Sequence, residues 1–407
     1  MSRSCDCWPS SPIRRETDDD TALSADPRPG CESSRAFFVR STVDPFSPSD
    51  CCWTSIRLRF TEYAVQPTRE LTLRKERDFR LWRVMPLADV LMNLELNELA
   101  CQLIEDVTDG PEDLRITQVD LPGCGPLLDF GVESEGGLEA GCALASICMS
   151  GLADVGIVPG QLGDWGWQQV VVQTDSPVAA CLFSQYAGWQ INVGKFFAMG
   201  SGPMRAAVAK EPLFDKLWYR EDANQVVGVL ETAKLPGQDV FEYIAEATSV
   251  EPTDVALCVA PTSSMAGNLQ VVARSVETAL HKMFELGFDV NRIRSAIGSA
   301  PLPPVAKNDM EGIGRTNDAI LYGGRVTLWV MGDDESISEI ATRIPAMSST
   351  AYGRPFLEIF EAAGRDFYKI DPLLFSPAEI VIQNVETGRV HIAGKTNLEV
   401  LKRSFGL

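Results

Sequence analysis

The chain has 407 residues, with 36 Lys and Arg against 56 Asp and Glu, which gives a formal charge of −20. An acidic protein repels phosphate backbones and anionic lipid, so general nucleic-acid and membrane-surface binding are disfavoured and a small-molecule partner is favoured. The length suggests two or three domains, the 45% hydrophobic content is typical of a globular protein, and no apolar run approaches the ~20 residues that span a bilayer.

Residues 1–84 differ in composition from the rest of the chain. They carry 14 Lys and Arg, 13 Asp and Glu and five of the 11 cysteines, with no hydrophobic periodicity. We expect them to be largely disordered, either as a spurious extension ahead of a true start at Met85 or Met92, or as a genuine regulatory tail. They show neither a secretory signal nor a transit peptide, so a cytoplasmic location is expected.

The cysteines do not suggest a metal site. The spacings in residues 1–84 are C-x-C and C-C, which fit no standard four-ligand zinc pattern. The other six cysteines lie mostly in apolar stretches, and we expect them to be reduced thiols in the core.

From residue 94 onward, helical and strand patterns alternate. Leu96, Leu99, Leu103 and Val107 recur at helical spacing and predict an amphipathic helix over residues 94–107. The pattern is that of a mixed α and β chain. Strands are predicted at 115–120, 127–132, 169–173, 225–230, 254–259, 319–330 and 379–385, and helices at 138–150, after Pro177, and at 239–248, 267–286, 335–343 and 355–363.

Two stretches share a strand, a Thr-containing turn and a helix. They are VVVQTDSPVAACLFSQYAG at residues 170–188 and ALCVAPTSSMAGNLQVVARS at residues 256–275, and they suggest a duplication. Neither carries the glycine fingerprint of a dinucleotide fold or a P-loop lysine, which argues against hydride transfer and nucleotide-triphosphate chemistry.

The helix predicted over residues 267–286 carries a polar stripe. Gln270, Arg274, Glu277 and His281 fall at i, i+4, i+7 and i+11 and share one side of the helix. Spacing alone favours a solvated Arg–Glu pair on a surface helix. The flanking sequence APTSSMAGN is small and nearly uncharged, which instead suits a ligand. In a pocket, Glu277 is a candidate general base and Arg274 a candidate for binding and charge control.

Two further segments are candidates for ligand contact. NVGKFFAMGSGPMR places Ser201 and Gly202 at a sharp turn before a helix predicted to begin near Pro203, where backbone N–H groups could hold an anion or a polar ring edge. Residues 304–325 are rich in polar side chains, and their composition fits a loop as well as a binding site: Lys307, Asp309, Arg315, Thr316, Asn317, Asp318 and Arg325.

Four long segments carry a family resemblance: GLEAGCALASICMSGLADVGI, QTDSPVAACLFSQYAGWQINVGKFFAMGSGPMRA, APTSSMAGNLQVVARSVETALHKMFELGFDV and APLPPVAKNDMEGIGRTNDAILYGGR. Over residues 94–407 the chain resembles the methenyltetrahydromethanopterin cyclohydrolases. The resemblance implies a cytoplasmic enzyme of one-carbon metabolism that reversibly hydrolyses 5,10-methenyltetrahydromethanopterin to 5-formyltetrahydromethanopterin. It implies a catalytic region at 85–407 with an α+β fold of two similar mixed subdomains and a substrate cleft between them. It also implies a homo-oligomer, typically a trimer, with no metal and no permanently bound cofactor.

The resemblance also implies roles for individual residues. The family's catalytic arginine and glutamate match Arg274 and Glu277. Glu277 is expected to deprotonate the attacking water, and Arg274 to hold Glu277 in place and keep the cationic substrate from pairing with it. Other residues are expected to bind the substrate. The polar edge of the pterin would be bound by Thr316, Asn317, Asp318 and the backbone at Ser201 and Gly202. An anionic tail of the substrate would be bound by Lys195, Arg205, Lys307 and Arg325.

Two other functions remain open at this point. A non-catalytic reduced-pterin-binding protein would not need Glu277, and the presence of both Arg274 and Glu277 speaks against it. A cyclohydrolase acting on methenyltetrahydrofolate would attack the same kind of carbon, but the sequence shows none of the folate cyclohydrolase patterns. The direction of flux, toward the formyl product in formaldehyde oxidation or toward the methenyl form in methanogenesis, is also open.

Overall fold

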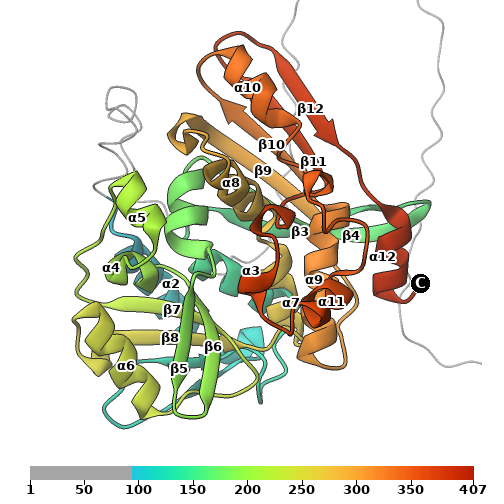
Figure 1. Cartoon of the computed structure of the whole chain (residues 1–407). Helices are drawn as coiled ribbons and strands as arrows, with labels where there is room; N and C mark the ends of the chain where they lie inside the picture. The colour runs from blue at the N-terminus through green and yellow to red at the C-terminus, as the bar shows by residue number, and fades with distance from the viewer. Residues whose placement is uncertain (1–93) are drawn as a thin grey trace, which may run out of the picture. The chain divides into compact units, whose positions relative to one another are not determined.

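The structure is a computed structural model that describes residues 94–407, so the expectations for residues 1–84 lie outside the described residues. Two mixed six-stranded sheets, each with helices packed on it, make up this region (Figure 1). The predicted α+β fold of two similar mixed parts is therefore confirmed.

The first sheet has the strand order β1-β2-β8-β7-β6-β5. β2, β8 and β7 run parallel to one another, and the remaining pairs are antiparallel. Its strands are β1 (Thr117–Val119), β2 (Leu127–Asp129), β5 (Trp189–Val193), β6 (Phe196–Ser201), β7 (Val226–Glu231) and β8 (Val255–Ala260).

Both faces of the first sheet are buried because consecutive residues of its central strands β7 and β8 are apolar. Val226 and Val255 pack with the helices α4 and α6, while Val227 and Ala256 pack with α2 and α3 on the opposite face. A strand that is buried on both faces has a continuous apolar sequence, as VVGVLE and VALCVA do. The helices on this sheet are α2 (Leu96–Thr108), α3 (Leu138–Cys148), α4 (Met204–Val208) and α6 (Gln238–Thr248).

The second sheet has the order β12-β11-β10-β9-β4-β3, in which only β10 and β11 are parallel. Its largest core lies between one sheet face and the helices that cover it. The strands are β3 (Asp154–Leu162), β4 (Trp165–Thr174), β9 (Ile293–Pro301), β10 (Arg325–Val330), β11 (Glu379–Asn384) and β12 (Val390–Gly394).

The remaining helices are α5 (Pro212–Leu217), α7 (Met265–Val272), α8 (Ser275–Glu285), α9 (Asp309–Gly323), α10 (Asp334–Ala341), α11 (Phe356–Ala362) and α12 (Leu398–Phe405), together with the π-helix η3 (Val178–Gln185). Short 3-10 turns lie at η2 (Pro111–Leu114), η4 (Pro252–Asp254), η5 (Val290–Arg292), η6 (Ala346–Ser348), η7 (Phe367–Lys369) and η8 (Pro372–Leu374). The helix predicted after Pro177 is thus present as η3. The six cysteines of this region are free thiols, as expected, and three of them are buried.

Two sequence predictions are wrong around residue 320. The strand expected over 319–330 begins only at Arg325, and the segment that composition allowed as a loop is the long helix α9. The glycines of α9 explain the error, because glycine suggests a loop, whereas here it allows the helix to pack closely against its neighbours. A Cβ on Gly312 would lie 3.0 Å from the Thr262 backbone, and one on Gly314 would lie 3.0 Å from Leu357. The strands β3, β5, β6, β9 and β12 and the helices α5 and α12 were not predicted from the sequence.

Asp129, at the end of β2, organises the loop that follows. Its buried carboxylate accepts four backbone N–H groups, from residues 131 to 134, at 2.6–2.9 Å. These bonds outweigh burial and hold the pKa of Asp129 below its usual value. The carboxylate therefore stabilises the fold above its unfolded pKa, and this contribution is lost as the pH falls.

We expect Asp129→Asn to lower the free energy of unfolding at pH 7 by about 2–4 kcal/mol, because bonds to a charged acceptor are lost and an amide NH₂ faces N–H donors. Denaturant unfolding measures the change. Asp120→Asn, at an exposed neighbouring position, is the control and should leave stability unchanged. Equal effects of the two substitutions would contradict the role of Asp129.

Candidate active site

The predicted polar stripe lies on two helices instead of one. α7 ends at Val272, α8 begins at Ser275, and Arg274 is the N-cap of α8. The Gln185 side chain donates from Nε2 to the Ala273 carbonyl oxygen at 3.2 Å. In an unbroken helix that carbonyl would accept the N–H four residues later, so the side-chain bond stabilises the break.

Three members of the stripe are buried. Gln270, Arg274 and Glu277 are 3%, 7% and 5% exposed, respectively. The interpretation of Arg274 and Glu277 as a solvated surface pair is therefore wrong. His281 stacks on Tyr186 with ring centroids 4.5 Å apart, and burial lowers the pKa of His281 to about 4, so its imidazole is neutral at physiological pH.

Arg274 is held by groups from several elements. Its Nη1 donates to the Gln185 carbonyl, and its Nη2 donates to Ser201 Oγ at 3.1 Å and approaches Cys148 Sγ at 3.9 Å. Ser201 Oγ in turn donates to the Val229 carbonyl at 3.2 Å. Arg274 Nε is buried without a partner among the described residues. The guanidinium is thus fixed in orientation, with its Nε nitrogen left unused.

Glu277 has a buried carboxyl group to which no hydrogen bond or ion pair is made within residues 94–407. Burial raises its pKa to about 7, while the positive charges of Arg274 and Arg205 oppose that rise. The expectation that Arg274 grips Glu277 directly needs correction, because Arg274 bonds to other groups and acts on Glu277 through its charge. A carboxyl with this pKa and no partner among the described residues is suited to accept a proton from a bound water.

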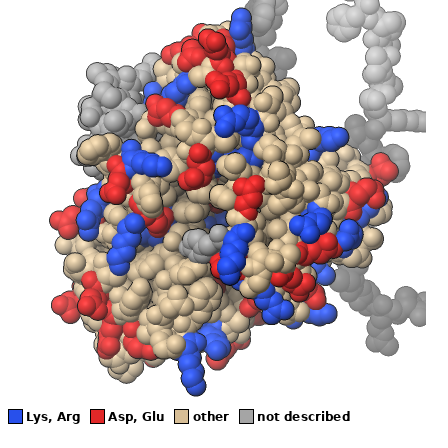
Figure 2. Space-filling model, viewed as in Figure 1, with Lys and Arg blue, Asp and Glu red and all other residues tan. Residues whose placement is uncertain are grey.

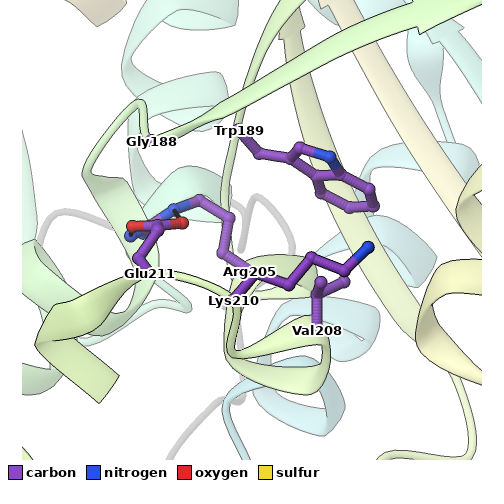
Figure 3. A pocket seen from close by; sticks show the side chains of 6 residues that line it. All are labelled: Gly188, Trp189, Arg205, Val208, Lys210 and Glu211. Carbon is purple, nitrogen blue, oxygen red and sulfur yellow. Dashed lines mark hydrogen bonds and ion pairs between the residues drawn. The ribbon is translucent and has the colours of Figure 1, made fainter. Parts of the chain in front are cut away.

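Arg205 was expected among exposed cations for a substrate tail, and the structure corrects this. Its fully buried guanidinium donates to the Glu211 carboxylate from Nε, at 2.9 Å, and from Nη2 (Figure 3). Its Nη1 lies 3.1–3.3 Å from the carbonyl oxygens of residues 182–184, at the end of η3. Arg205 therefore positions the end of η3, next to the Gln185 carbonyl that binds Arg274. It also lines a cavity of about 40 Å³ with Trp189.

A second carboxylate, which sequence reasoning missed, lies within range of the charge of Arg274. Glu231 ends β7, and its Oε1 accepts a hydrogen bond from Thr262 Oγ1. Ser263 donates from N and Oγ to Asp309 Oδ1 at 3.0 and 2.6 Å. Burial raises the pKa of Glu231, opposed by the Thr262 bond and by Arg274. The available signal was an acidic residue at the end of the apolar run VVGVL.

The sequence matches the family described as Cyclohydrolase (MCH) over residues 95–405. The chain belongs to this cyclohydrolase family. A methenyltetrahydromethanopterin cyclohydrolase of Rhodopirellula baltica is 46% identical over 318 residues, which cover 77% of this chain and 95% of that protein. Proteins of the same name are 43% identical in Methylobacillus flagellatus, covering 78% of this chain and 97% of that one, and 39% identical in Methanosarcina mazei, covering 77% and 99%.

The cyclohydrolase does not bring the expected pterin-edge residues together. Thr316 Oγ1 bonds back to the Gly312 carbonyl at 2.9 Å, and Asn317 Nδ2 bonds to the Ile313 carbonyl at 2.9 Å. Asp318 accepts the Phe356 N–H at 2.8 Å and faces α11 and α12. Successive helical residues point about 100° apart. These three side chains therefore cannot form one recognition edge.

The turn after β6 is also different from expectation. Ser201 binds Arg274, but the Gly202 N–H already donates to the Ser184 carbonyl at 2.9 Å. Gly202 has φ +90°, and a Cβ there would lie 3.2 Å from the Val227 carbonyl oxygen, so the position requires glycine. Its amide is thus not available to a ligand. The helix expected near Pro203 is α4, for which Pro203 is the N-cap.

The three other cations predicted for the substrate tail are exposed (Figure 2 shows one face, with both charge signs interspersed). Lys195 lies in the turn between β5 and β6, Lys307 pairs with Glu311 at 2.9 Å, and Arg325 lies 3.6 Å from Glu379. Their role in tail binding stays a prediction. Within residues 94–407, no cluster of three or more His, Cys, Asp or Glu side chains is arranged to hold a metal ion.

Proposed function

We propose that this cyclohydrolase opens the methenyl bridge of 5,10-methenyltetrahydromethanopterin by hydrolysis and releases 5-formyltetrahydromethanopterin. The reaction name comes from the relatives, which match most of this chain. One observation carries the proposal: the carboxyl of Glu277 is buried close to the charge of Arg274, makes no hydrogen bond or ion pair within residues 94–407, and has a pKa of about 7.

The reacting carbon of the substrate lies in a cationic amidinium and is already electrophilic. Catalysis then requires a positioned water and a group that takes its proton. Glu277 accepts one proton as the water oxygen bonds to the carbon, which gives a neutral tetrahedral adduct. Glu277 then returns this proton to the departing nitrogen, the C–N bond breaks, and the hydroxyl proton leaves as the formyl C=O forms. The overall reaction releases one proton.

Arg274 has two effects in this scheme. Its positive charge favours the ionised form of Glu277. Its fixed side chain also keeps the cationic substrate from forming an unproductive ion pair with the Glu277 carboxylate. Because its guanidinium is bound to Ser201 and to the Gln185 carbonyl, little reorganisation is needed during the reaction.

The test of the function is loss of the amidinium ultraviolet absorbance when the purified protein is mixed with methenyltetrahydromethanopterin. Rapid loss with this substrate, and much slower loss with methenyltetrahydrofolate, is expected. Tight binding of the first substrate without absorbance loss would instead make the protein a pterin carrier. Faster turnover of the folate would assign the activity to folate metabolism.

The pH dependence of kcat provides a second prediction. Glu277 acts as a base only when ionised, and its pKa is raised to about 7 by burial. We therefore expect kcat to rise about tenfold per pH unit below pH 7 and to level off above it. Initial rates between pH 5.5 and 8.5, corrected for the uncatalysed opening, measure this. A kcat that does not change between pH 6 and 8 would contradict the assignment of Glu277.

We further infer that residues 85–407 form the catalytic region. We also infer that the enzyme works as a homo-oligomer, a trimer in the family's manner, in the cytoplasm and in formaldehyde oxidation. The support is the family resemblance of residues 94–407. No permanently bound cofactor is proposed. None of the helices in the described region is long and apolar enough to cross a membrane.

A further inference from the structure

Glu277 has to lose one proton to solvent in each reaction cycle. The proposed reaction releases one proton overall, and the carboxyl that takes it is buried. An acid with a pKa of about 7 gives its proton to water at about 10²–10³ s⁻¹ at most, because the reverse step is limited by diffusion. Enzymes commonly turn over at ~1–10³ s⁻¹, so even an exposed carboxyl with this pKa would be close to limiting. Burial keeps buffer away from Glu277, and a route outward is therefore needed.

One neighbour of Glu277 along its own helical turns is able to carry a proton. Residues three and four positions away on a helix are neighbours, which for Glu277 are Ala273, Arg274, Leu280 and His281. Alanine and leucine carry no titratable group, and a guanidinium does not release its proton. The imidazole of His281 can accept a proton on one nitrogen and release another from the second nitrogen.

The charged and titratable groups near Glu277 on other described elements do not provide a second outlet. Arg205 of α4 influences the pKa of both Glu277 and His281, which places the three side chains in one neighbourhood. Its guanidinium stays protonated. Cys181 of η3 also lies near Glu277, but burial raises the pKa of Cys181 well above its usual value, and the charge of Glu277 adds to that rise. This thiol therefore keeps its proton.

His281 lies between Glu277 and the surface along α8. Glu277, His281 and Glu285 follow one another at intervals of four residues and share one side of the helix. Glu277 is buried, the His281 side chain is 14% exposed, and the Glu285 side chain is 40% exposed. His281 Nε2 lies 3.9 Å from Glu285 Oε1, so this nitrogen is directed to the exposed end of the helix. Water can take a proton there, with or without the Glu285 carboxylate.

The imidazole is held in place without the use of its nitrogens. It stacks on Tyr186, and the Arg205 guanidinium carbon lies 5.1 Å from the centroid of the same Tyr186 ring. Neither ring nitrogen of His281 forms a hydrogen bond among residues 94–407. The pKa of His281, about 4, is about three units below that of Glu277. This gap slows transfer about a thousandfold from the ~6 × 10¹² s⁻¹ of a barrierless step, which leaves it far faster than turnover.

We propose that His281 carries the proton of each reaction cycle from Glu277 to solvent, and carries it inward when the reaction runs backward. The inference rests on the proposed function of the same site. As the formyl C=O forms, Glu277 takes up the proton that the hydroxyl group loses. The carboxyl O–H bond then breaks as one nitrogen of His281 takes this proton, directly or through one water. The N–H bond of the other nitrogen breaks as its proton enters the solvent. Glu277 is ionised again, and exchange with water restores the tautomer of His281.

The test is a single turnover of His281→Phe at pH 8, with enzyme in excess and two signals followed together. Loss of the amidinium absorbance reports bridge opening, and a pH indicator in weakly buffered solution reports proton release. Phenylalanine keeps an aromatic ring beside Tyr186 but cannot carry a proton. We expect the bridge to open within about threefold of the wild-type rate and proton release to be about 10- to 100-fold slower than opening. In the wild type the two signals should coincide.

Two further variants make the test specific. His281→Ala leaves a space that free imidazole can enter, so added imidazole should restore proton release in His281→Ala but not in His281→Phe, whose ring fills that space. His281→Ala also carries the test if His281→Phe fails to fold. His391→Phe, which changes the other histidine of the sequence on β12, is the matched control, and its two signals should coincide as in the wild type.

Proton release that keeps pace with bridge opening in both His281 variants would overturn the inference. Slower bridge opening without a lag of the proton would also overturn it, since His281 would then only support the shape of the site. Failure of the proposed function itself is seen separately, as a wild-type protein that does not open the bridge.

Discussion

Glu277→Gln lowers kcat by about 10²–10⁴-fold, the usual contribution of a general base. The amide has nearly the shape of the carboxyl group but cannot take a proton from water. No bond within the described chain holds the Glu277 carboxyl, so the substitution breaks no contact that the fold needs. KM should change little, because Glu277 acts on the water and the departing nitrogen more than on substrate binding.

The same substitution should make the protein more stable. Burial raises the pKa of Glu277 to about 7, so the native state favours the protonated form more than the unfolded chain does. Stability is therefore highest below the unfolded pKa, falls as the pH rises toward 7, and stays reduced above it. At pH 8 we expect Glu277→Gln to raise the free energy of unfolding by about 1–3 kcal/mol.

Unfolding at pH 5 and pH 8, together with steady-state rates, checks both effects. Glu285→Gln, at the exposed end of α8, is the matched control and should alter neither quantity appreciably. A Glu277→Gln variant that keeps the wild-type kcat would remove the general-base role. A variant that is less stable at pH 8 would show that the carboxyl is needed for the fold.

The proximity of Arg274 and Glu277 was predictable from the sequence because it depends on local spacing. Arg274 and Glu277 are three residues apart, and this places them on one side of any helix, whether or not it is broken two residues earlier. Their burial followed only from the three-dimensional packing. Spacing alone had favoured a solvated pair, because an amphipathic pattern does not say whether its polar side meets water or a pocket.

Residues contributed by distant segments could not be assembled from the sequence. Glu231 neighbours Ser201, which binds Arg274, only because β6 and β7 are paired in one register. Gln185 binds Arg274 from the end of a π-helix that Arg205 holds. Arg205 illustrates the opposite error. Its charge suggested a binding role, whereas the structure pairs it with Glu211 and with backbone carbonyls. The sequence shows that a residue is charged, but it does not show which group that charge binds.

Glycine-rich segments were the other source of error. α9 contains three glycines in a polar sequence, which indicates a loop when local preference is considered alone. Tertiary packing overrides that preference, because Gly312 lets the helix approach the turn at Thr262. This error also made the predicted binding edge wrong. Residues 316–318 were expected to share one edge of a loop, but on a helix their side chains point in three directions.

Arg274→Gln is expected to reduce kcat at pH 7 by about 10²–10³-fold, the range found when one preorganised charge-stabilising group is removed. The loss has two parts. The side chain no longer reaches Ser201 and the Gln185 carbonyl together, and the positive charge that favours ionised Glu277 disappears. The pKa of Glu277 therefore rises, and the rise of kcat with pH should shift to above pH 7.

Arg274→Lys distinguishes the effect of the positive charge of Arg274 from the effect of its hydrogen-bond geometry. Lysine keeps the positive charge but cannot reproduce the fork that binds two acceptors at once. We expect kcat to fall while the pH profile stays centred near 7, and we expect exposed Arg343→Gln to have no effect on either. If Arg274→Gln and Arg274→Lys shifted the profile equally, the charge of Arg274 would not be what tunes Glu277. Arg274 would then contribute only the bonds to Ser201 and to the end of η3, and Arg205 would remain as the positive charge that acts on Glu277.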